Sequence, residues 1–177
     1  LSKNRVIGMG GALDSSRFKT YLSLALDKPA NDIQGMVIGG HGDTTMIPLT
    51  RLASYNGTPV AQHLTKDVLD KVAADTMVGG ATLTKLLGTS AWYAPGASVS
   101  YLVDSIVNDQ KRMIPCSVFL AGEYNQDDIC IGVPCIIGKD GVEAIIDVNL
   151  NTAEQEKFDQ SATAVRNMNQ ALNEVLK

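Results

Sequence analysis

The spacing of apolar residues along the chain alternates between a helical and a strand-like period. Apolar side chains recur at intervals of three and four in four stretches, which is the pattern of an amphipathic helix. The predicted helices cover residues 3–27, 66–87, 97–108 and 152–176.

Residues that favour helix ends and bends lie at the borders of these segments and within them. Pro29 ends the first helix, and the glycine pair at 79–80 predicts a bend in the second. Ser98 is a suitable N-cap for the third helix. Thr152 and Gln155 have the spacing of a capping box, so we expect the last helix to begin there.

Short apolar runs bounded by turn residues predict strands between the helices. Asn-Gly at 56–57 and the run Gly-Lys-Asp-Gly at 138–141 predict the hairpin turns. The strands are hairpin-linked and do not alternate with helices, which favours an α+β fold of largely antiparallel strands packed with long helices. The predicted strands cover residues 36–38, a pair around 55–59, 113–120, 129–137 and 142–148.

The composition is that of one globular domain. Hydrophobic residues form 45% and charged residues 19% of 177, and the net charge is −4 without a Lys/Arg cluster. Neither a nucleic acid nor an anionic membrane is therefore an expected partner. No apolar run approaches the ~20 residues of a membrane span and no secretion signal is visible, so we expect a cytoplasmic protein.

The three cysteines lie in strand-like runs without CxxC spacing or nearby histidines. We expect Cys116, Cys130 and Cys135 to be reduced thiols of the core, and we expect no metal site.

Three polar residues stand out against apolar surroundings. Asp14 and Arg17 are three apart in a predicted helix and so share one face, while His41 lies in a glycine loop at the end of a strand. Together they would suit the interconversion of a 2-hydroxy acid and a 2-keto acid. The guanidinium can bind a carboxylate with two hydrogen bonds, and the imidazole can exchange the hydroxyl proton. A carboxylate on the other ring nitrogen would orient the ring and raise its pKa.

Each feature also has a simpler interpretation. An Asp–Arg pair at this spacing is usually a surface salt bridge, and a single histidine in a loop is more often structural, as we expect for His63. The glycines at 8, 10 and 11 do not follow a strand, and Leu13 stands where the dinucleotide fingerprint needs a small residue. They are therefore interpreted as sites of close helix packing.

Several motifs resemble the C-terminal domain of the lactate/malate dehydrogenase family, in the family's order and spacing over essentially the whole chain. The pair LDSSRF and GGHGD is the most specific of them. The motifs are Arg5–Met9, Leu13–Phe18, Gly39–Asp43, Tyr93–Ser98, Lys111–Cys116, Gly132–Pro134 and Gly138–Glu143.

The resemblance implies a role for each candidate residue. His41 corresponds to the general acid and base, Asp14 to the carboxylate that orients it, and Arg17 to the clamp on the substrate's C1 carboxylate. Pro95 falls where the family contacts the nicotinamide end of NAD.

The resemblance further implies malate and oxaloacetate as the substrate pair. Lactate dehydrogenases usually have Glu where this chain has Gly40, and a small hydroxylated residue where it has Ala91. Tyr93-Ala94-Pro95 also resembles the malate type. A lactate dehydrogenase, or an enzyme for another 2-hydroxy acid, remains the alternative.

The chain contains no βαβ unit with GxGxxG, so we expect the NAD-binding Rossmann half to be missing. Because the sequence opens at Leu1-Ser2-Lys3, we expect it to start in mid-protein. The resemblance implies a homodimer or homotetramer for the whole enzyme and no turnover for residues 1–177 alone. A domain used only for subunit assembly is the other alternative.

Overall fold

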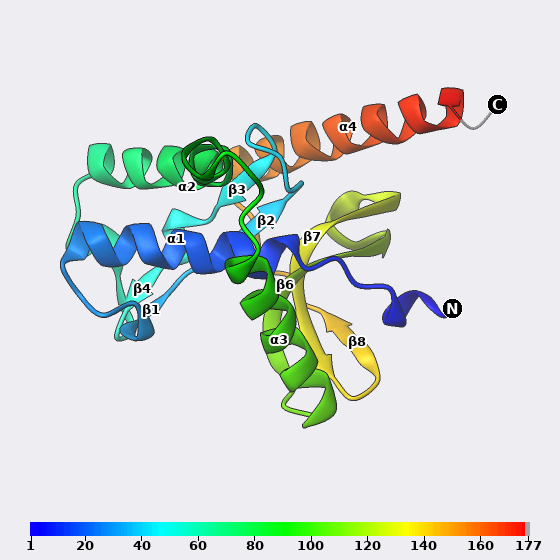
Figure 1. The fold of residues 1–177 in the computed structure, drawn as a ribbon, viewed down its shortest axis with the longest axis horizontal. Coiled ribbons are helices and arrows are strands. Elements are labelled where there is room, and N and C mark those ends of the chain that lie inside the picture. Colours follow the sequence, from blue (N-terminus) through cyan, green and yellow to red (C-terminus); the bar gives the residue numbers. More distant parts are fainter. Residues whose placement is uncertain (176–177) are drawn as a thin grey trace.

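A computed structural model describes residues 1–175 of the chain (Figure 1). The four long helices lie close to the predicted segments. They are α1 (Gly10–Leu26), α2 (Lys66–Leu87), α3 (Tyr93–Val107) and α4 (Thr152–Val175). Five short 3-10 turns connect other elements, at Lys3–Arg5, Ala30–Asp32, Thr50–Leu52, Val60–Gln62 and Glu123–Asn125. Among the described residues, none of the helices has the length and apolar character that a membrane span requires.

All strand pairs within the described residues are antiparallel, and they form a five-stranded and a three-stranded sheet. The central strand β7 pairs with β6 along its length, while its other edge pairs with β2 at Gly132, near the middle of the strand, and with β8 over its last four residues. The predicted α+β class is confirmed. The strands are β1 (Ile33–Gln34), β2 (Val37–Gly39), β3 (Met46–Pro48), β4 (Ser54–Tyr55), β5 (Thr58–Pro59), β6 (Arg112–Ala121), β7 (Asp127–Gly138) and β8 (Gly141–Ile145).

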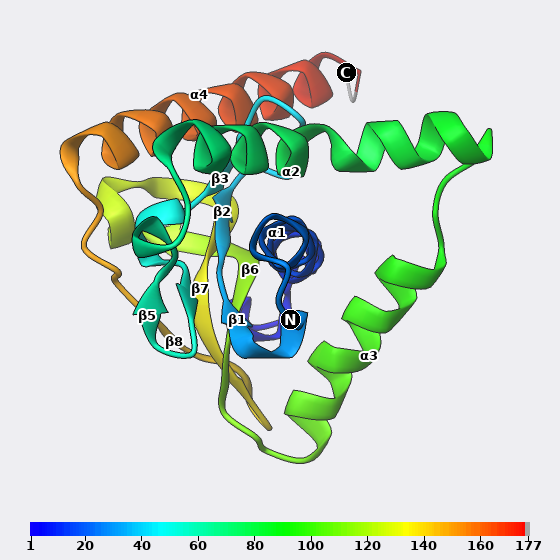
Figure 2. The same ribbon diagram turned by 90° about the vertical axis from the view of Figure 1, so that its left-hand side faces the viewer.

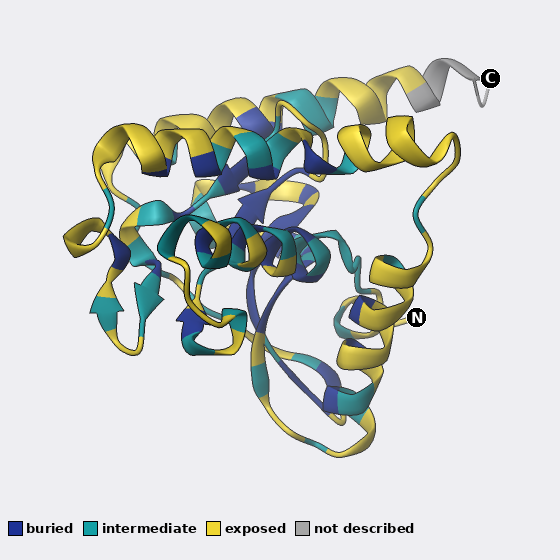
Figure 3. Ribbon diagram, turned by 60° about the vertical axis from the view of Figure 1, so that its left-hand side comes forward, coloured by how far each residue is buried: buried dark blue, intermediate teal, exposed yellow. Residues whose placement is uncertain are grey.

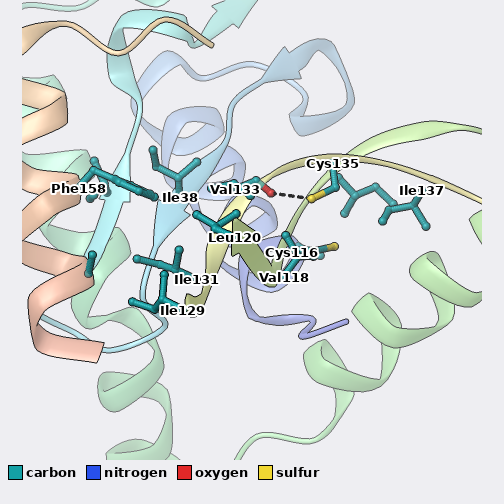
Figure 4. Packing of buried hydrophobic residues seen from close by; sticks show 14 of the residues in the cluster. Ile38, Cys116, Val118, Leu120, Ile129, Ile131, Val133, Cys135, Ile137 and Phe158 are labelled. Carbon is teal, nitrogen blue, oxygen red and sulfur yellow. Dashed lines mark hydrogen bonds between the residues drawn. The ribbon is translucent and has the colours of Figure 1, made fainter. Parts of the chain in front are cut away.

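The apolar side chains form two clusters, and α1 contributes to both. The larger cluster packs β6 and β7 against α4, with Phe158 fully buried (Figure 4). The smaller cluster packs Phe18 and Leu22 of α1 against α2 and the short strands. Figure 2 shows α1 beside the sheet and below α2, and in Figure 3 the buried residues are concentrated on the strands next to α1.

The first predicted helix is shorter than the sequence indicated. The chain passes Gly8 in an extended conformation, where its N–H and C=O pair with Ser117 on β6 at 2.8 and 2.9 Å. These backbone groups are therefore unavailable to a helix, and α1 begins only at Gly10. The predicted close packing of the glycines is confirmed, because a Cβ on Gly11 would lie 2.6 Å from the carbonyl oxygen of Pro115.

The predicted start of the third helix is wrong, because α3 begins at Tyr93 and Ser98 is buried inside the helix. Pro95 did not prevent the earlier start, since the first turn of a helix has no use for the N–H group that proline lacks. The glycine pair at 79–80 lies within the continuous helix α2.

The last helix begins where it was expected, but a different pair of residues caps it. The side chain of Asn151 accepts a hydrogen bond from the N–H of Glu154 at 2.9 Å, and Glu154 Oε2 accepts one from the N–H of Asn151 at 3.0 Å. The capping box is therefore Asn151–Glu154, and the assignment to Thr152 and Gln155 was shifted by one residue. Residue 176, the predicted end of this helix, lies outside the described residues.

Two further expectations need correction. Cys116 and Cys135 are buried, but Cys130 is exposed, because side chains alternate between the faces of β7. The last strand ends at Ile145 and does not reach Val148. Beyond it, the Tyr124 hydroxyl donates to the carbonyl of Ile146 and accepts from the N–H of Val148.

We expect Asn151→Ala to lower the free energy of unfolding by about 1 kcal/mol, because the N–H of Glu154 loses its cap. Thr152→Ala is the matched control and should have a much smaller effect. Urea unfolding of both variants measures the difference, and equal losses would contradict the assigned cap.

Candidate active site

Asp14 lies in the second turn of α1 with its side chain only 2% exposed, and it contacts a guanidinium and an imidazole. Its Oδ1 accepts a hydrogen bond from Nη1 of Arg17 at 2.9 Å, and its Oδ2 lies 2.6 Å from Nδ1 of His41. The structure thus brings the three predicted residues together. The pair of Asp14 and Arg17 is not the exposed surface salt bridge that its spacing alone allowed.

His41 comes from the loop between β2 and β3, and its side chain is 55% exposed. Since Nδ1 faces the Asp14 carboxylate, it carries the proton of that hydrogen bond, and Nε2 is the nitrogen left for a ligand. A Cβ on Gly10 would lie 2.7 Å from Cγ of His41, so this glycine makes room for the ring.

The hydrogen bond that the ring of His41 donates to the Asp14 carboxylate is the main cause that raises the pKa of His41 above its ordinary value of 6.5. Burial acts in the opposite direction, as does the charge of Arg17, while the negative charges of Asp14 and Asp43 support the rise. The direction that the sequence predicted is confirmed.

Arg17 is held between its own helix and α2. Its side chain is 19% exposed, and the glycine pair of α2 lies directly against it. A Cβ on Gly79 would lie 2.7 Å from Cδ of Arg17, and one on Gly80 would lie 3.2 Å from its Nη2. The glycine pair therefore gives Arg17 the space that it occupies.

A cleft of about 1060 Å³ opens between α1, the second half of α2, and α3. Arg17, Ala91 and Pro95 all line it, whereas Asp14 and His41 do not. Pro95 thus shares a cleft with Arg17 but is not part of the Asp14–His41 contact.

Ser15 is a residue next to the site that the sequence pattern did not indicate. Its hydroxyl joins α1 to the strand that precedes His41. It accepts a hydrogen bond from the N–H of Val37 at 2.9 Å and donates one to the carbonyl of Gly11 at 2.6 Å. A serine beside a candidate acid was a weak signal, because serines next to charged residues are common on helix surfaces. Its burial, at 7% exposed, distinguishes it.

His63 lies apart from this cluster, with its ring edge-to-face against Tyr55 at 5.9 Å. Within residues 1–175, no group of three or more His, Cys, Asp or Glu side chains could hold a metal ion.

Comparison with known proteins places the chain in a family. Residues 11–175 match the lactate/malate dehydrogenase, alpha/beta C-terminal domain. A malate dehydrogenase of Flavobacterium johnsoniae is 78% identical over 99% of this chain, which covers 57% of that protein. The chain thus spans little more than half the length of this relative.

Solved structures of the family superimpose closely on the chain. The malate dehydrogenase of Salinibacter ruber is 39% identical with a TM-score of 0.96, over 99% of this chain and 57% of that one. The lactate dehydrogenase of Cryptosporidium parvum, complexed with lactic acid and nicotinamide adenine dinucleotide, is 35% identical with a TM-score of 0.94, over 98% and 56%.

The fold and the candidate site thus define an α+β domain in which one buried carboxylate contacts both an imidazole and a guanidinium. The chain belongs to the lactate/malate dehydrogenase family, and it corresponds to the C-terminal domain.

We expect Asp14→Asn to lower the pKa of His41, because the variant removes the charge that favours the imidazolium. NMR titration of the histidine ring measures this, and His63 should be unchanged as an internal control. In the wild-type protein, the raised pKa stabilises the fold fully below the unfolded value of about 6.5. This stabilisation is lost as the pH rises through the folded value. An unaltered titration of His41 in the variant would contradict the assigned contact.

Proposed function

We propose that residues 1–177 are the catalytic domain of an NAD-dependent malate dehydrogenase, which interconverts malate and oxaloacetate. One observation carries the proposal: Asp14 holds the His41 ring on one carboxylate oxygen and the Arg17 guanidinium on the other. The names of the relatives support malate as the substrate.

In this proposal, His41 transfers the proton. During oxidation of malate, Nε2 accepts the proton of the C2 hydroxyl while the hydride leaves the same carbon. In the reverse direction, the protonated ring returns it to the carbonyl oxygen of oxaloacetate. Asp14 supports both directions, because it fixes the ring orientation and stabilises the imidazolium that forms.

Arg17 binds the C1 carboxylate of the substrate. One of its terminal nitrogens is engaged by Asp14, and the guanidinium retains further donors for a two-pronged contact. The neighbouring glycines fix where this group lies, so the carboxylate would be bound at a defined distance from His41.

A nicotinamide cofactor supplies the hydride acceptor in this reaction. The described residues fit only the nicotinamide end of this cofactor, because Pro95 and Arg17 line the same cleft. All strand pairs among the described residues are antiparallel, so they provide no βαβ unit that could bind the phosphates of the cofactor. We therefore assign the rest of the NAD site to an N-terminal Rossmann domain outside this chain. Residues 1–177 alone should then have no turnover.

Two features favour malate over lactate. Gly40 precedes His41 where lactate dehydrogenases usually have Glu, and a Cβ there would lie 2.7 Å from Oγ1 of Thr45. The loop as folded thus has no room for that glutamate. Ala91 lines the cleft where a hydroxylated residue would be expected in lactate dehydrogenases.

The whole enzyme is proposed to be a homodimer or homotetramer in the cytoplasm. Large apolar side chains on α3 are exposed in the single chain, including Tyr93 at 93% and Val107 at 74%. A domain that serves assembly alone would not need the buried contact between Asp14 and His41, so we favour the catalytic assignment.

Loss of NADH absorbance with oxaloacetate or pyruvate tests the proposal on the full-length protein. We expect rapid turnover of oxaloacetate, slow turnover of pyruvate, and none for residues 1–177 alone. Faster use of pyruvate would favour the lactate alternative. Absence of turnover with any 2-keto acid would overturn the catalytic assignment, and turnover by the isolated chain would overturn the assigned need for a second domain.

We expect Arg17→Lys in the full-length protein to lower kcat/KM for oxaloacetate by roughly 100-fold, about the loss of one charge-assisted hydrogen bond. The ammonium cannot make a two-pronged contact. The Kd for NADH, measured by fluorescence, should stay nearly unchanged. Lys19→Arg is the matched control on the same helix, and comparable loss of NADH binding in Arg17→Lys would argue against the clamp.

A further inference from the structure

The loop that carries His41 is tied to a helix from the far end of the chain. Ser161 of α4 accepts a hydrogen bond from the N–H of Gly40 at 2.8 Å. The same hydroxyl donates to the carbonyl of Thr45, also at 2.8 Å. Figures 1 and 2 both show the loop between β2 and β3 against α4. One buried side chain, 3% exposed, therefore joins the two ends of the loop.

The packing around this hydroxyl leaves little freedom at the loop ends. Gly39 has a positive φ of 87°, and a Cβ there would lie 2.6 Å from the carbonyl oxygen of Thr45 and 2.9 Å from Oγ of Ser161. A Cβ on Gly40 would lie 3.3 Å from Cγ2 of Val165. The backbone next to His41 is thus in close contact with α4, and this contact requires glycine at positions 39 and 40.

The interior of the loop is closed by its own contacts. The N–H of Gly42 donates to Oγ1 of Thr45 at 2.9 Å, and the N–H of Thr45 donates to the carbonyl of Gly42 at 2.9 Å. Among the described residues, the side-chain hydrogen bonds that tie this turn to other elements are those of Ser161 and the contact of His41 with Asp14. Without Ser161, the turn could shift as a unit relative to α1.

We propose that Ser161 is a positioning residue for the reaction: it fixes the His41 loop so that the imidazole meets Asp14 and presents Nε2 to the substrate. The inference rests on the proposed role of His41 as acid and base. It adds α4, more than 100 residues further along the chain, to the elements that determine the geometry of the active site.

Loss of the hydroxyl would have two local consequences. An alanine at 161 would leave the N–H of Gly40 and the carbonyl of Thr45 without their partner in a buried place, and the loop would move to find new ones. The contact between His41 and Asp14 would then lengthen or become intermittent. The charged groups facing His41 are Asp14 and Arg17 of α1 and Asp43 of its own loop, and α4 adds none among those that perturb it.

The test uses the full-length enzyme with Ser161→Ala and a matched control, Ser105→Ala. Ser105 is also fully buried and also donates to a backbone carbonyl, that of Ile137 at 2.7 Å, but it lies on α3 away from the loop. Ser161→Cys serves as a second variant, because it retains the size and a weak donor if the alanine variant does not fold. The readouts are the pKa of His41 by NMR, the pH profile of kcat, and NADH binding.

We expect Ser161→Ala to move the pKa of His41 down toward 6.5 and to lower kcat about tenfold, with NADH binding unchanged. Ser161→Cys should move both quantities in the same direction by less. Ser105→Ala should lower stability without shifting the pKa of His41.

An unchanged pKa and pH profile in Ser161→Ala, or in Ser161→Cys if only that variant folds, would overturn the inference. So would an equal shift in Ser105→Ala. The titration of the ring does not depend on turnover. If the proposed function were wrong, the variant His41→Asn would instead keep full activity. The NMR spectrum of the same variant identifies the His41 resonance, because that signal is missing from it.

Discussion

The candidate site depends on one buried carboxylate, Asp14, that faces a guanidinium and an imidazole. A carboxylate that is almost fully removed from water is costly unless its charge is compensated and its oxygens are hydrogen-bonded. Asp14 meets this requirement with the His41 ring on one oxygen and the Arg17 guanidinium on the other. The same arrangement that stabilises the buried charge also sets where the imidazole of His41 and the guanidinium of Arg17 lie relative to each other.

Much of the surrounding fold serves to hold these partners in place. Helix α1 spans both apolar clusters, so the carboxylate is carried on an element that is packed on two sides. Ser15 ties this helix to the strand before His41, and Ser161 ties the loop after that strand to α4. The glycines of α2 give Arg17 its space. Local packing thus determines how Asp14, Arg17 and His41 lie relative to one another.

The periodicity of apolar residues predicted the four helices, the strands β6 and β7 and the α+β class. The chemistry of the side chains, together with the motif resemblance, indicated Asp14, Arg17 and His41 as the candidate site. The errors arose where tertiary contacts override local preference. Gly8 pairs with a strand edge, so α1 starts late, and Asn151 caps α4 although a capping-box pattern is present one residue later. Ser161 could not be found in this way, because a serine in a helix gives no sign of a partner 121 residues away.

The arrangement of Asp14, Arg17 and His41 is tested best by a crystal structure of the full-length protein with NADH and a non-reactive dicarboxylate analogue of malate. We expect Arg17 to bind one carboxylate of the analogue through two N–H groups. We also expect Nε2 of His41 to lie within hydrogen-bonding distance of the C2 oxygen while Nδ1 still contacts Asp14. An analogue bound away from Arg17, or a His41 ring turned away from Asp14 in the complex, would refute the proposed roles of these residues.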